Sequence, residues 1–422
     1  MKVPIKASKF ISIEKIYKAK VRLKGVVDHT PLMRNFNLSE NYDCNIFLKR
    51  EDLQVVRSYK IRGAYNKMAS MRKKDLENGI VCASAGNHAQ GVALACQKLD
   101  VNGKIYMPRT TPKQKIDKVR RFGKERVEII LNGDTFDASY MMALVDSEEN
   151  NKVFVHPFND EKVIEGQATV GLEILEDCEE NIDFVFVAIG GGGLVSGLGS
   201  CLKQISPKTK IIGVEPKGAA AMYESLQKNE LVTLEKIDPF VDGAAVQRVG
   251  ETTFNYCRNI IDDMILVPEG KVCSTILQLY NEEAIVAEPA GALTIAALDF
   301  YKEKIKGKNV VCVVSGGNND ITRTEEIKER SLLYEGLKHY FLIRFPQRAG
   351  ALREFLNNVL GKNDDITHFE YTKKTNRNAG PALIGIELKD PKDYDGLIER
   401  MKKNEIKFQT LTDNPTLFEL LV

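Results

Sequence analysis

The sequence DFVFVAIGGGGLVSGLGSCL, residues 183–202, indicates the fold class of most of the chain. Residues 183–189 form an apolar run rich in β-branched and aromatic side chains, which is typical of a buried strand. The glycines that follow lead directly into a helical pattern. A strand that passes through a short turn into a helix is the repeating unit of α/β proteins with a parallel sheet.

The same rhythm recurs from about residue 44 to residue 320. The predicted strands are residues 45–49, 79–83, 104–108, 127–131, 183–189, 210–215 and 309–314. Helical patterns separate them, and one of these has Thr111 as its predicted N-cap, Pro112 in the first helical position and Gly123 at its end. We therefore expect an open, doubly wound α/β sheet, whose ligands bind beyond the carboxyl ends of the strands.

The composition changes after Asp320. Residues 321–339 are charged and helix-prone, and the chain then follows the order strand, helix, strand, strand, helix, strand. That order is typical of ferredoxin-like folds. We expect an α/β domain with two lobes at residues 1–328, a connector at residues 329–338 and a small domain at residues 339–422.

The charge and the cysteine content exclude several classes of protein. The 60 Lys and Arg residues against 58 Asp and Glu give a formal charge of +2, which offers no electrostatic basis for binding nucleic acid or a membrane surface. The eight cysteines form no CxxC pair and no Cys/His cluster, and are typical of small buried residues in a reducing compartment. The lack of such a cluster leads us to expect no metal site. The sequence also has no leader-like segment and no long apolar window, so the protein is expected in the cytoplasm.

Four loops lie where a predicted strand ends or a helix begins. The first, residues 58–64, contains Lys60, which by itself is better explained as a solvated side chain. The second, residues 84–88 (SAGNH), opens a helix whose free N–H groups suit a carboxylate, although a capped turn explains it equally well.

The third loop, residues 190–194 (GGGGL), is the most informative. Consecutive glycines are costly to order, and they can expose a row of backbone N–H groups around a phosphate. The run matches neither GxGxxG nor the GK[ST] of a P-loop, so it favours phosphate binding but not dinucleotide binding.

The fourth loop, residues 315–318 (SGGN), would present the Ser315 hydroxyl at the same edge of one open sheet. A lysine, an anion-binding helix end, a phosphate cradle and a serine suit a phosphorylated aldehyde cofactor.

Five segments together resemble a known family. They are KREDLQVVRSYKIRGA (49–64), SAGNHAQG (84–91), GGGGL (190–194), AEPAGA (287–292) and SGGNND (315–320). They are similar to segments of the threonine dehydratases, pyridoxal-phosphate enzymes of the tryptophan-synthase-β class (fold type II), and the similarity runs from about residue 25 to residue 320. The segment FLIRFPQRAGALREFLNNVL (341–360) also resembles the ACT-like regulatory domain of the biosynthetic, isoleucine-inhibited form.

The resemblance implies a role for each loop. Lys60 would carry pyridoxal phosphate as a Schiff base and, once displaced by the amino substrate, would remove the α-hydrogen. Asn87 would hydrogen-bond the 3-oxygen of the ring, and Ser315 would face the pyridine nitrogen. The phosphate would lie against Gly190, Gly191, Gly192, Gly193 and Leu194, and the substrate carboxylate against Ser84, Ala85, Gly86, Asn87 and His88. L-Threonine would lose water and then ammonia to give 2-oxobutanoate, the first step of isoleucine biosynthesis.

Departures from neighbouring families narrow the chemistry. Relatives that racemise serine carry a second serine where this chain has Ala85, which disfavours racemisation. They also bind a divalent metal after a Val-Glu-Pro segment, whereas here Glu215 and Pro216 are followed by Lys217, a glycine and three alanines. Cysteine synthases would show an Asp after the lysine-containing turn and a Thr-Ser-Gly-Asn-Thr loop, and this chain has neither.

Three alternatives stay open: a serine-preferring dehydratase, an amino-acid-binding regulator that has lost its chemistry, and a nicotinamide dehydrogenase. A methyl group is worth only about 1–3 kcal/mol in a pocket, so the sequence does not separate threonine from serine. The intact Lys60, glycine run and Ser315 argue against an inactive regulator. The missing GxGxxG argues against a dehydrogenase.

The C-terminal domain has no catalytic-looking cluster of its own. Its segment RFPQRAGAL (344–352) joins a strand to a helix N-terminus, where Arg348 and the backbone N–H groups of Ala349, Gly350 and Ala351 could meet an amino-acid carboxylate. By resemblance the effector is isoleucine, and a structural or oligomerisation role is the alternative. Regulated relatives lead us to expect a homodimer or homotetramer. We also expect a branched side chain at Gly192 to weaken cofactor retention far more than stability without cofactor.

Overall fold

The computed structural model describes residues 9–373, 378–411 and 418. The chain divides into two compact units, Met1–Asp320 and Ile321–Val422. Among the described residues, none of the helices combines the length and the apolar character that a membrane span requires.

The larger sheet of the first unit has six strands in the order β1-β2-β10-β7-β8-β9. Their bounds are Leu32–Asn35 (β1), Asn45–Arg50 (β2), Phe184–Ala188 (β7), Lys210–Pro216 (β8), Asp263–Val267 (β9) and Asn309–Val314 (β10). β1 is antiparallel to β2, and all other neighbours are parallel.

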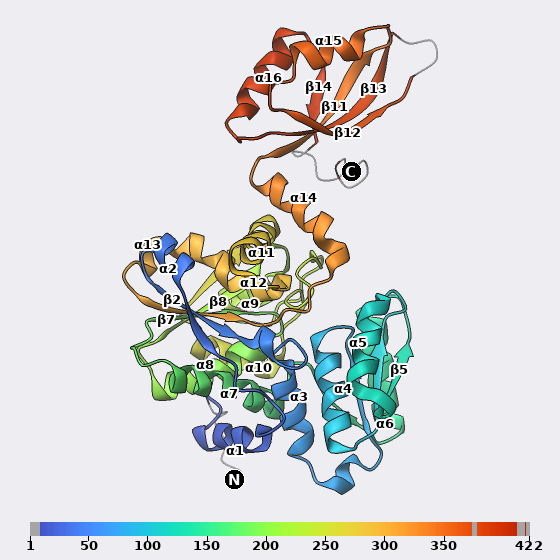
Figure 1. Ribbon diagram of the computed structural model, residues 1–422. Helices are drawn as coiled ribbons and strands as arrows, with labels where there is room; N and C mark the ends of the chain where they lie inside the picture. The colour runs from blue at the N-terminus through green and yellow to red at the C-terminus, as the bar shows by residue number, and fades with distance from the viewer. Residues whose placement is uncertain (1–8, 374–377, 412–417, 419–422) are drawn as a thin grey trace. The chain divides into compact units, whose positions relative to one another are not determined.

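Helices cover both faces of this sheet, as Figure 1 shows. They include α7 (Glu161–Asp177), α8 (Gly193–Ile205) and α10 (Glu251–Ile260) on one face, with α11 (Glu269–Glu283) and α12 (Pro289–Ala296) on the other. Strands β7 and β8 are buried along almost their whole length, which explains why they read as continuous apolar runs. The expected doubly wound α/β class is confirmed.

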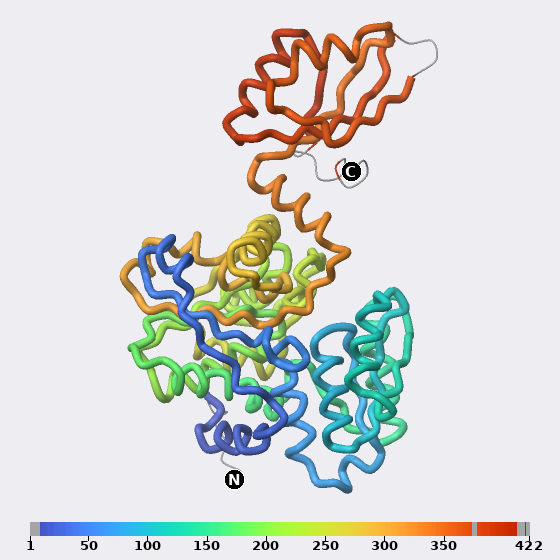
Figure 2. The backbone as a smooth tube through the Cα atoms, in the orientation of Figure 1, coloured from blue at the N-terminus to red at the C-terminus, as the bar shows by residue number. Residues whose placement is uncertain are grey.

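A second, smaller sheet in the same unit has four parallel strands in the order β5-β4-β3-β6. Its elements are β3 (Ile80–Ala83), α4 (Asn87–Leu99), β4 (Gly103–Met107), α5 (Lys113–Gly123), β5 (Val127–Leu131), α6 (Phe136–Glu149) and β6 (Val153–Phe154). This lobe has its own hydrophobic core, made by residues such as Ile80, Val92 and Ile105, separate from the core around β7 and α8. Figure 2 shows the chain passing through it as one block of consecutive residues.

All seven strands predicted for this unit are present, but they do not form one sheet. Three of them build the smaller sheet and four the larger one, so the expectation of a single edge carrying every loop is wrong. Strands β1, β6 and β9 were not predicted, and β6 has only two residues. The predicted cap of α5 is also displaced by one residue, because the carbonyl of Pro112, rather than Thr111, accepts the first helical hydrogen bonds.

Helix α3 (Lys60–Ala69) lies where the two lobes meet and packs against α4 and α7. Three glycines permit this close packing. A side chain at Gly63 would overlap Val163 and Gln167, one at Gly166 would overlap the Arg62 carbonyl, and one at Gly91 would crowd the backbone of Lys60. The first turn of α3 is therefore held from both sides.

The other helices of this unit are short or peripheral. They are α1 (Ile13–Leu23), α2 (Phe36–Tyr42), α9 (Ala221–Lys228) and α13 (Lys302–Ile305), with single 3₁₀ turns at Glu51–Leu53, Lys73–Leu76, Lys124–Arg126, Lys217–Ala219 and Ala297–Tyr301.

The second unit is a four-stranded antiparallel sheet with two helices, after a 3₁₀ turn (Ile321–Arg323) and helix α14 (Thr324–Tyr334). Its elements are β11 (Lys338–Pro346), α15 (Ala351–Asn358), β12 (Asp365–Tyr371), β13 (Ala379–Glu387), α16 (Asp393–Lys403) and β14 (Phe408–Thr410). The sheet order β12-β13-β11-β14 and the element order βαββαβ are those of a ferredoxin-like fold. Phe341, Ile384 and Leu397 are fully buried in its core.

Candidate active site

The segment that contains Lys60 is attached to the end of strand β10. The N–H of Tyr59 donates to the carbonyl of Ser315 over 3.2 Å, and the N–H of Gly317 donates to the carbonyl of Arg57 over 2.9 Å. Ser58 and Gly316 form an antiparallel bridge between these contacts. The structure thus brings together the first and fourth loops, which lie more than 250 residues apart in the sequence.

The Lys60 amine lies near two neutral histidines. Lys60 is partly buried, and its Nζ donates to the carbonyl of Pro157 over 3.2 Å. Burial, with the charge of Lys60, lowers the pKa of His88 to about 3. Burial lowers the pKa of His156 to about 4, and Lys60 adds to the effect. Both imidazoles are therefore neutral at neutral pH and act as hydrogen-bonding groups.

These histidines hold the loop beside Lys60. The ring Nε2 of His88 bonds to the carbonyl of Val155 over 2.8 Å. The Nδ1 of His156 accepts from the N–H groups of Phe158 and Asn159 over 3.2 and 2.8 Å. His88 thus holds the loop of residues 155–159 in position. Its role at the substrate carboxylate stays an expectation.

The loop of residues 84–88 leaves space at Gly86. The N–H of Gly86 donates to the Ser84 hydroxyl over 3.2 Å, and α4 begins at the next residue, Asn87. A Cβ added at Gly86 would meet no heavy atom within 4 Å. The first N–H groups of a helix have no intrahelical partner. Open space beside such a helix end suits a small carboxylate.

The four glycines lie between the end of β7 and the start of α8 at Gly193. Gly192 has a φ of +88°, a backbone conformation that residues other than glycine rarely adopt. A Cβ at Gly191 would come within 2.2 Å of the Phe158 ring, and a Cβ at Gly190 within 2.9 Å of Ala244. Glycine is therefore required at these positions by the packing of neighbouring residues, whether or not a ligand binds to the loop. Leu194 has its side chain buried in the core, so only its backbone N–H is available to a phosphate.

The residues present fit pyridoxal phosphate, the cofactor that the resemblance implies. Gly192 shapes the cradle at the N-terminus of α8, where the backbone N–H groups of a helix end are available to a phosphate. Lys60 supplies an amine, and Ser315, 3% exposed at the end of β10, supplies a neutral hydroxyl. Ser58, which bridges to Gly316, has a fully buried hydroxyl without a partner among the described residues.

Arg62, two residues after Lys60, lies in a buried ion network. Its guanidinium donates two hydrogen bonds of 2.8 Å to Glu51 and two of 2.5 and 2.7 Å to Glu173. Arg62 is only 1% exposed, and Lys49 adds a second buried cation 2.8 Å from Glu173. Buried charges are tolerated when they are paired and hydrogen-bonded in this way.

Two residues that the sequence analysis did not assign connect the two lobes at the site. The buried carboxylate of Glu288 accepts a 2.6 Å hydrogen bond from Asn87, and the amide of Asn318 donates to Asn87 over 2.7 Å. Both residues lie in segments that carry the family resemblance. The role of Glu288 and Asn318 could not be predicted from sequence, because it depends on their contact with Asn87 of the other lobe. Lys118 and Lys115 of α5 add contacts across the lobes, to Asn318 at 3.1 Å and to Asp242 at 2.7 Å.

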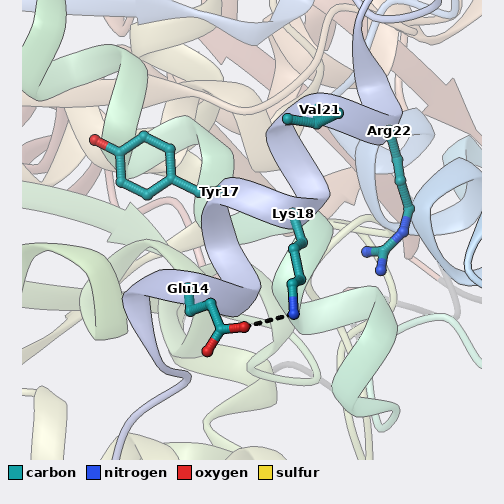
Figure 3. Close-up of a pocket in the computed structure, with 5 residues that line it drawn as sticks. All are labelled: Glu14, Tyr17, Lys18, Val21 and Arg22. Atoms are coloured by element: carbon teal, nitrogen blue, oxygen red, sulfur yellow. Dashed lines mark hydrogen bonds and ion pairs between the residues drawn. The ribbon is translucent and has the colours of Figure 1, made fainter.

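Two pockets in the described part of the molecule lie away from these loops. One is a depression on helix α1, lined by Glu14, Tyr17, Lys18, Val21 and Arg22 (Figure 3). Another lies at the amino end of strands β3 and β4 and includes Asn78, Asn102 and Lys152. Neither contains any of the loops described above. They are not candidates for the chemistry, because ligands of open α/β sheets bind at the carboxyl ends of strands.

The predicted effector residues lie at the start of helix α15. Gly350, with a φ of +82°, precedes the helix, and a Cβ there would meet nothing within 4 Å. Arg348 is exposed and already paired with Glu354 through both terminal nitrogens, one of them at 2.7 Å. A carboxylate bound by Arg348 would therefore compete with Glu354.

Comparison with known proteins agrees with this geometry. The family described as pyridoxal-phosphate dependent enzyme matches residues 23–316, and the family described as the C-terminal regulatory domain of threonine dehydratase matches residues 329–421. The chain is 60% identical over 412 residues to a Halalkalibacterium halodurans protein named L-threonine dehydratase biosynthetic IlvA, covering 98% of this chain and 99% of that protein. It is 58% identical over 422 residues to the Bacillus subtilis protein of the same name, covering 100% of both.

Solved structures show the same relationship. The processed form of threonine deaminase isoform 2 from Solanum lycopersicum has a TM-score of 0.72 and 42% identity, covering 76% of this chain and 95% of that one. Maize serine racemase has a TM-score of 0.71 and 31% identity, covering 76% of this chain and 98% of that one. Across its larger unit the chain belongs to the pyridoxal-phosphate-dependent enzymes, and it carries the C-terminal regulatory domain of the threonine dehydratases.

Proposed function

We propose that the protein is an L-threonine ammonia-lyase that converts L-threonine to 2-oxobutanoate and ammonia, the first step of isoleucine biosynthesis. One observation carries the proposal: the backbone contacts between residues 57–59 and 315–317 hold Lys60 and Ser315 at one site. The relatives named above, alike along the whole chain, support the choice of threonine.

Each loop would hold one part of the cofactor or the substrate. Gly190, Gly191, Gly192, Gly193 and the N–H of Leu194 would hold the phosphate, with Asn87 at the ring oxygen and Ser315 at the ring nitrogen. Residues 84–88 would bind the substrate carboxylate at the N-terminus of α4, in the open space beside Gly86. Ser315 is neutral, so it does not force a proton onto the ring nitrogen, which favours elimination over transamination.

The reaction needs a base and an acidified hydrogen. When bound, pyridoxal phosphate supplies an electron-withdrawing ring that acidifies the α-hydrogen of the amino acid. Lys60 would remove this hydrogen, because its side-chain amine can act as a base. His88 and His156 are neutral at neutral pH, since their pKa values are lowered to about 3 and about 4.

The second unit would carry the regulation. We infer that residues 339–422 form the effector domain after a connector at 329–338, with residues 1–328 as the catalytic domain. Isoleucine is the proposed effector, bound near Arg348, Ala349, Gly350 and Ala351. A cytoplasmic homodimer or homotetramer is the proposed form of the enzyme.

The test is a direct assay of the purified chain loaded with pyridoxal phosphate. We expect 2-oxobutanoate and ammonia in equal amounts from L-threonine, with a higher kcat/KM for threonine than for serine. A higher kcat/KM for serine would reassign the enzyme to the serine-preferring dehydratases. Cofactor binding without turnover of either amino acid would leave the inactive regulator as the better description.

A further inference from the structure

Glu288 is a buried carboxylate to which the proposed chemistry gives no role. It is 6% exposed and directly precedes α12, which begins at Pro289. Its Oε1 accepts from the side-chain amide of Asn87 over 2.6 Å, and its Oε2 accepts from the backbone N–H of Asn318 over 3.3 Å. A buried carboxylate needs such donors, because an unpaired one would be strongly destabilising.

The side chain of Asn87 is fixed by its two neighbours. Its Nδ2 donates to Glu288, and its Oδ1 accepts from the Nδ2 of Asn318 over 2.7 Å. Asn318 is held in turn, because its Nδ2 also donates to the carbonyl of Val56 over 2.8 Å and its Oδ1 accepts from Lys118 over 3.1 Å. Rotating the Asn87 amide by half a turn would place N–H₂ against N–H₂ and oxygen against carboxylate. The network therefore permits only one orientation of Asn87.

This orientation leaves a donor for a ligand. A side-chain amide carries two hydrogens, and the bond to Glu288 uses one of them. We propose that Glu288 is a positioning residue for the cofactor: it fixes Asn87 as a donor, so that the second amide hydrogen is available to the ring oxygen of pyridoxal phosphate. The inference rests on the placement of Asn87 at the cofactor, which belongs to the proposed function above.

The charges around Glu288 make the carboxylate a specific requirement. The pKa of Glu288 is raised to about 7, because its burial and the charge of Asp242 outweigh the hydrogen bonds from Asn87 and Asn318 and the charge of Lys115. Lys118, on the same helix as Lys115, also faces it. Glutamine at this position would accept from Asn87 or from Asn318 but not from both, because its nitrogen can only donate.

The experiment compares Glu288→Gln with wild type and with Asp146→Asn. Asp146 is a matched control, since it is a buried carboxylate in the smaller lobe, bound by Lys152 at 2.7 Å and outside the four loops. The apoenzymes are titrated with pyridoxal phosphate, and the dissociation constant, the visible absorption maximum of the bound cofactor and the thermal midpoint of the apoenzyme are recorded. Asn318→Ala, which removes the donor on the other side of Asn87, serves as the second variant.

We expect Glu288→Gln and Asn318→Ala to raise the dissociation constant of the cofactor about tenfold, the effect of losing one hydrogen bond to a charged or fixed partner. The absorption maximum should shift in both, because a hydrogen bond to the ring oxygen is weakened, while the apoenzyme of Glu288→Gln stays at least as stable as wild type. Asp146→Asn should leave the constant and the spectrum unchanged.

Cofactor affinity and spectrum equal to wild type in both site variants would overturn the inference. Borohydride reduction of the wild-type holoenzyme separates this failure from failure of the proposed function. If the reduced cofactor is attached to Lys60 but the variants bind normally, only the role of Glu288 is wrong. If it is attached elsewhere, the placement of the cofactor itself is wrong.

Discussion

Arg62 and Glu51 form a fully buried, two-pronged ion pair, with both hydrogen bonds at 2.8 Å, two residues after Lys60. Because the same guanidinium is bound by Glu173 on α7, the pair ties the first turn of α3 to the larger lobe. The position of the Lys60 amine thus depends on residues that do not contact a ligand.

We expect Arg62→Met to destabilise the apoenzyme by about 3–5 kcal/mol, because Glu51 would lose the cation that pairs with it and Glu173 would keep only Lys49. Cofactor affinity should fall as well, since α3 loses its anchor. Denaturant unfolding of the apoenzyme measures the first effect. Arg72→Met is the control: Arg72 is 71% exposed in its pair with Asp75, so its loss should cost less than about 1 kcal/mol. Similar costs for the two variants would refute the structural role of the Arg62 network.

Lys60→Ala should abolish dehydration, because it removes both the cofactor anchor and the base. Loss of a group that acts in the chemical step typically lowers kcat by at least about a thousandfold. The fold should persist, since the only hydrogen bond recorded for the Lys60 side chain among the described residues is to the carbonyl of Pro157. Circular dichroism and the thermal midpoint of the apoenzyme check this. Turnover near the wild-type rate would exclude Lys60 as the base.

Gly86→Ala separates ligand binding from folding better than any change in the glycine run. The added methyl group meets no atom within 4 Å, although the φ of −126° and ψ of −141° at Gly86 lie outside the usual extended range. We expect apoenzyme stability to change by less than about 1 kcal/mol, because the cost of alanine in this conformation is offset by the freedom that the unfolded chain loses. The KM for threonine should rise severalfold, since the methyl group enters the space proposed for the substrate carboxylate. An unchanged KM would move the carboxylate site away from this loop.

The structure corrects the expectation for Gly192. Its φ of +88° strains any branched residue, and a Cβ would lie 2.8 Å from Met222 and 3.0 Å from Thr253. Gly192→Val is therefore expected to lower the stability of the apoenzyme by about 1–3 kcal/mol and also to weaken cofactor retention. A retained cofactor after dialysis would still argue against the phosphate cradle. Weaker retention alone would not support the phosphate cradle, because the loss of stability by itself could also weaken cofactor binding.

Local features of this protein were predictable from sequence, and contacts between distant segments were not. The passage from β7 through the glycines into α8 was predicted correctly, because a buried parallel strand, a glycine turn and a helix each leave a local pattern. The division into two sheets depends on which strands pair, and a short apolar run carries no information on its partner. Glu288 was not assigned because a glutamate before a proline at a helix start is ordinary; its function depends on Asn87, 201 residues away.

Glu288 should also leave a signature in the pH dependence of stability. Its pKa is about 7 in the folded protein against an ordinary value of 4.5, so between these two values the folded protein keeps a proton that the unfolded chain releases. As pH rises from about 4.5 to about 7, wild type should lose about 3 kcal/mol that Glu288→Gln does not lose. Urea unfolding of both apoenzymes at several pH values gives this difference directly.

The control for this prediction has the opposite sign. The pKa of Asp146 is lowered, because the hydrogen bonds from Lys152 and Tyr106 outweigh its burial. Asp146 therefore stabilises the fold above its ordinary pKa of 3.8, and that stability is lost as pH falls through the lower folded value. Asp146→Asn should thus be less stable than wild type at pH 7. A flat difference between Glu288→Gln and wild type from pH 4.5 to 7 would mean that the pKa of Glu288 is not raised in the folded protein.

The regulatory unit offers the last prediction. It has the ferredoxin-like order of strands and its own hydrophobic core. Helix α15 begins after the turn at Gly350, and the nearby Arg348 is already paired with Glu354. We expect isoleucine to raise the threonine concentration needed for half-maximal rate, within the roughly 5- to 150-fold range of a coupling of about 1–3 kcal/mol. Removing residues 329–422 should leave an enzyme that dehydrates threonine and does not respond to isoleucine. Threonine saturation curves of both forms, with and without isoleucine, measure this. If the full-length enzyme gives the same curve in both conditions, the domain has a structural role, and Arg348 is explained by its pair with Glu354 alone.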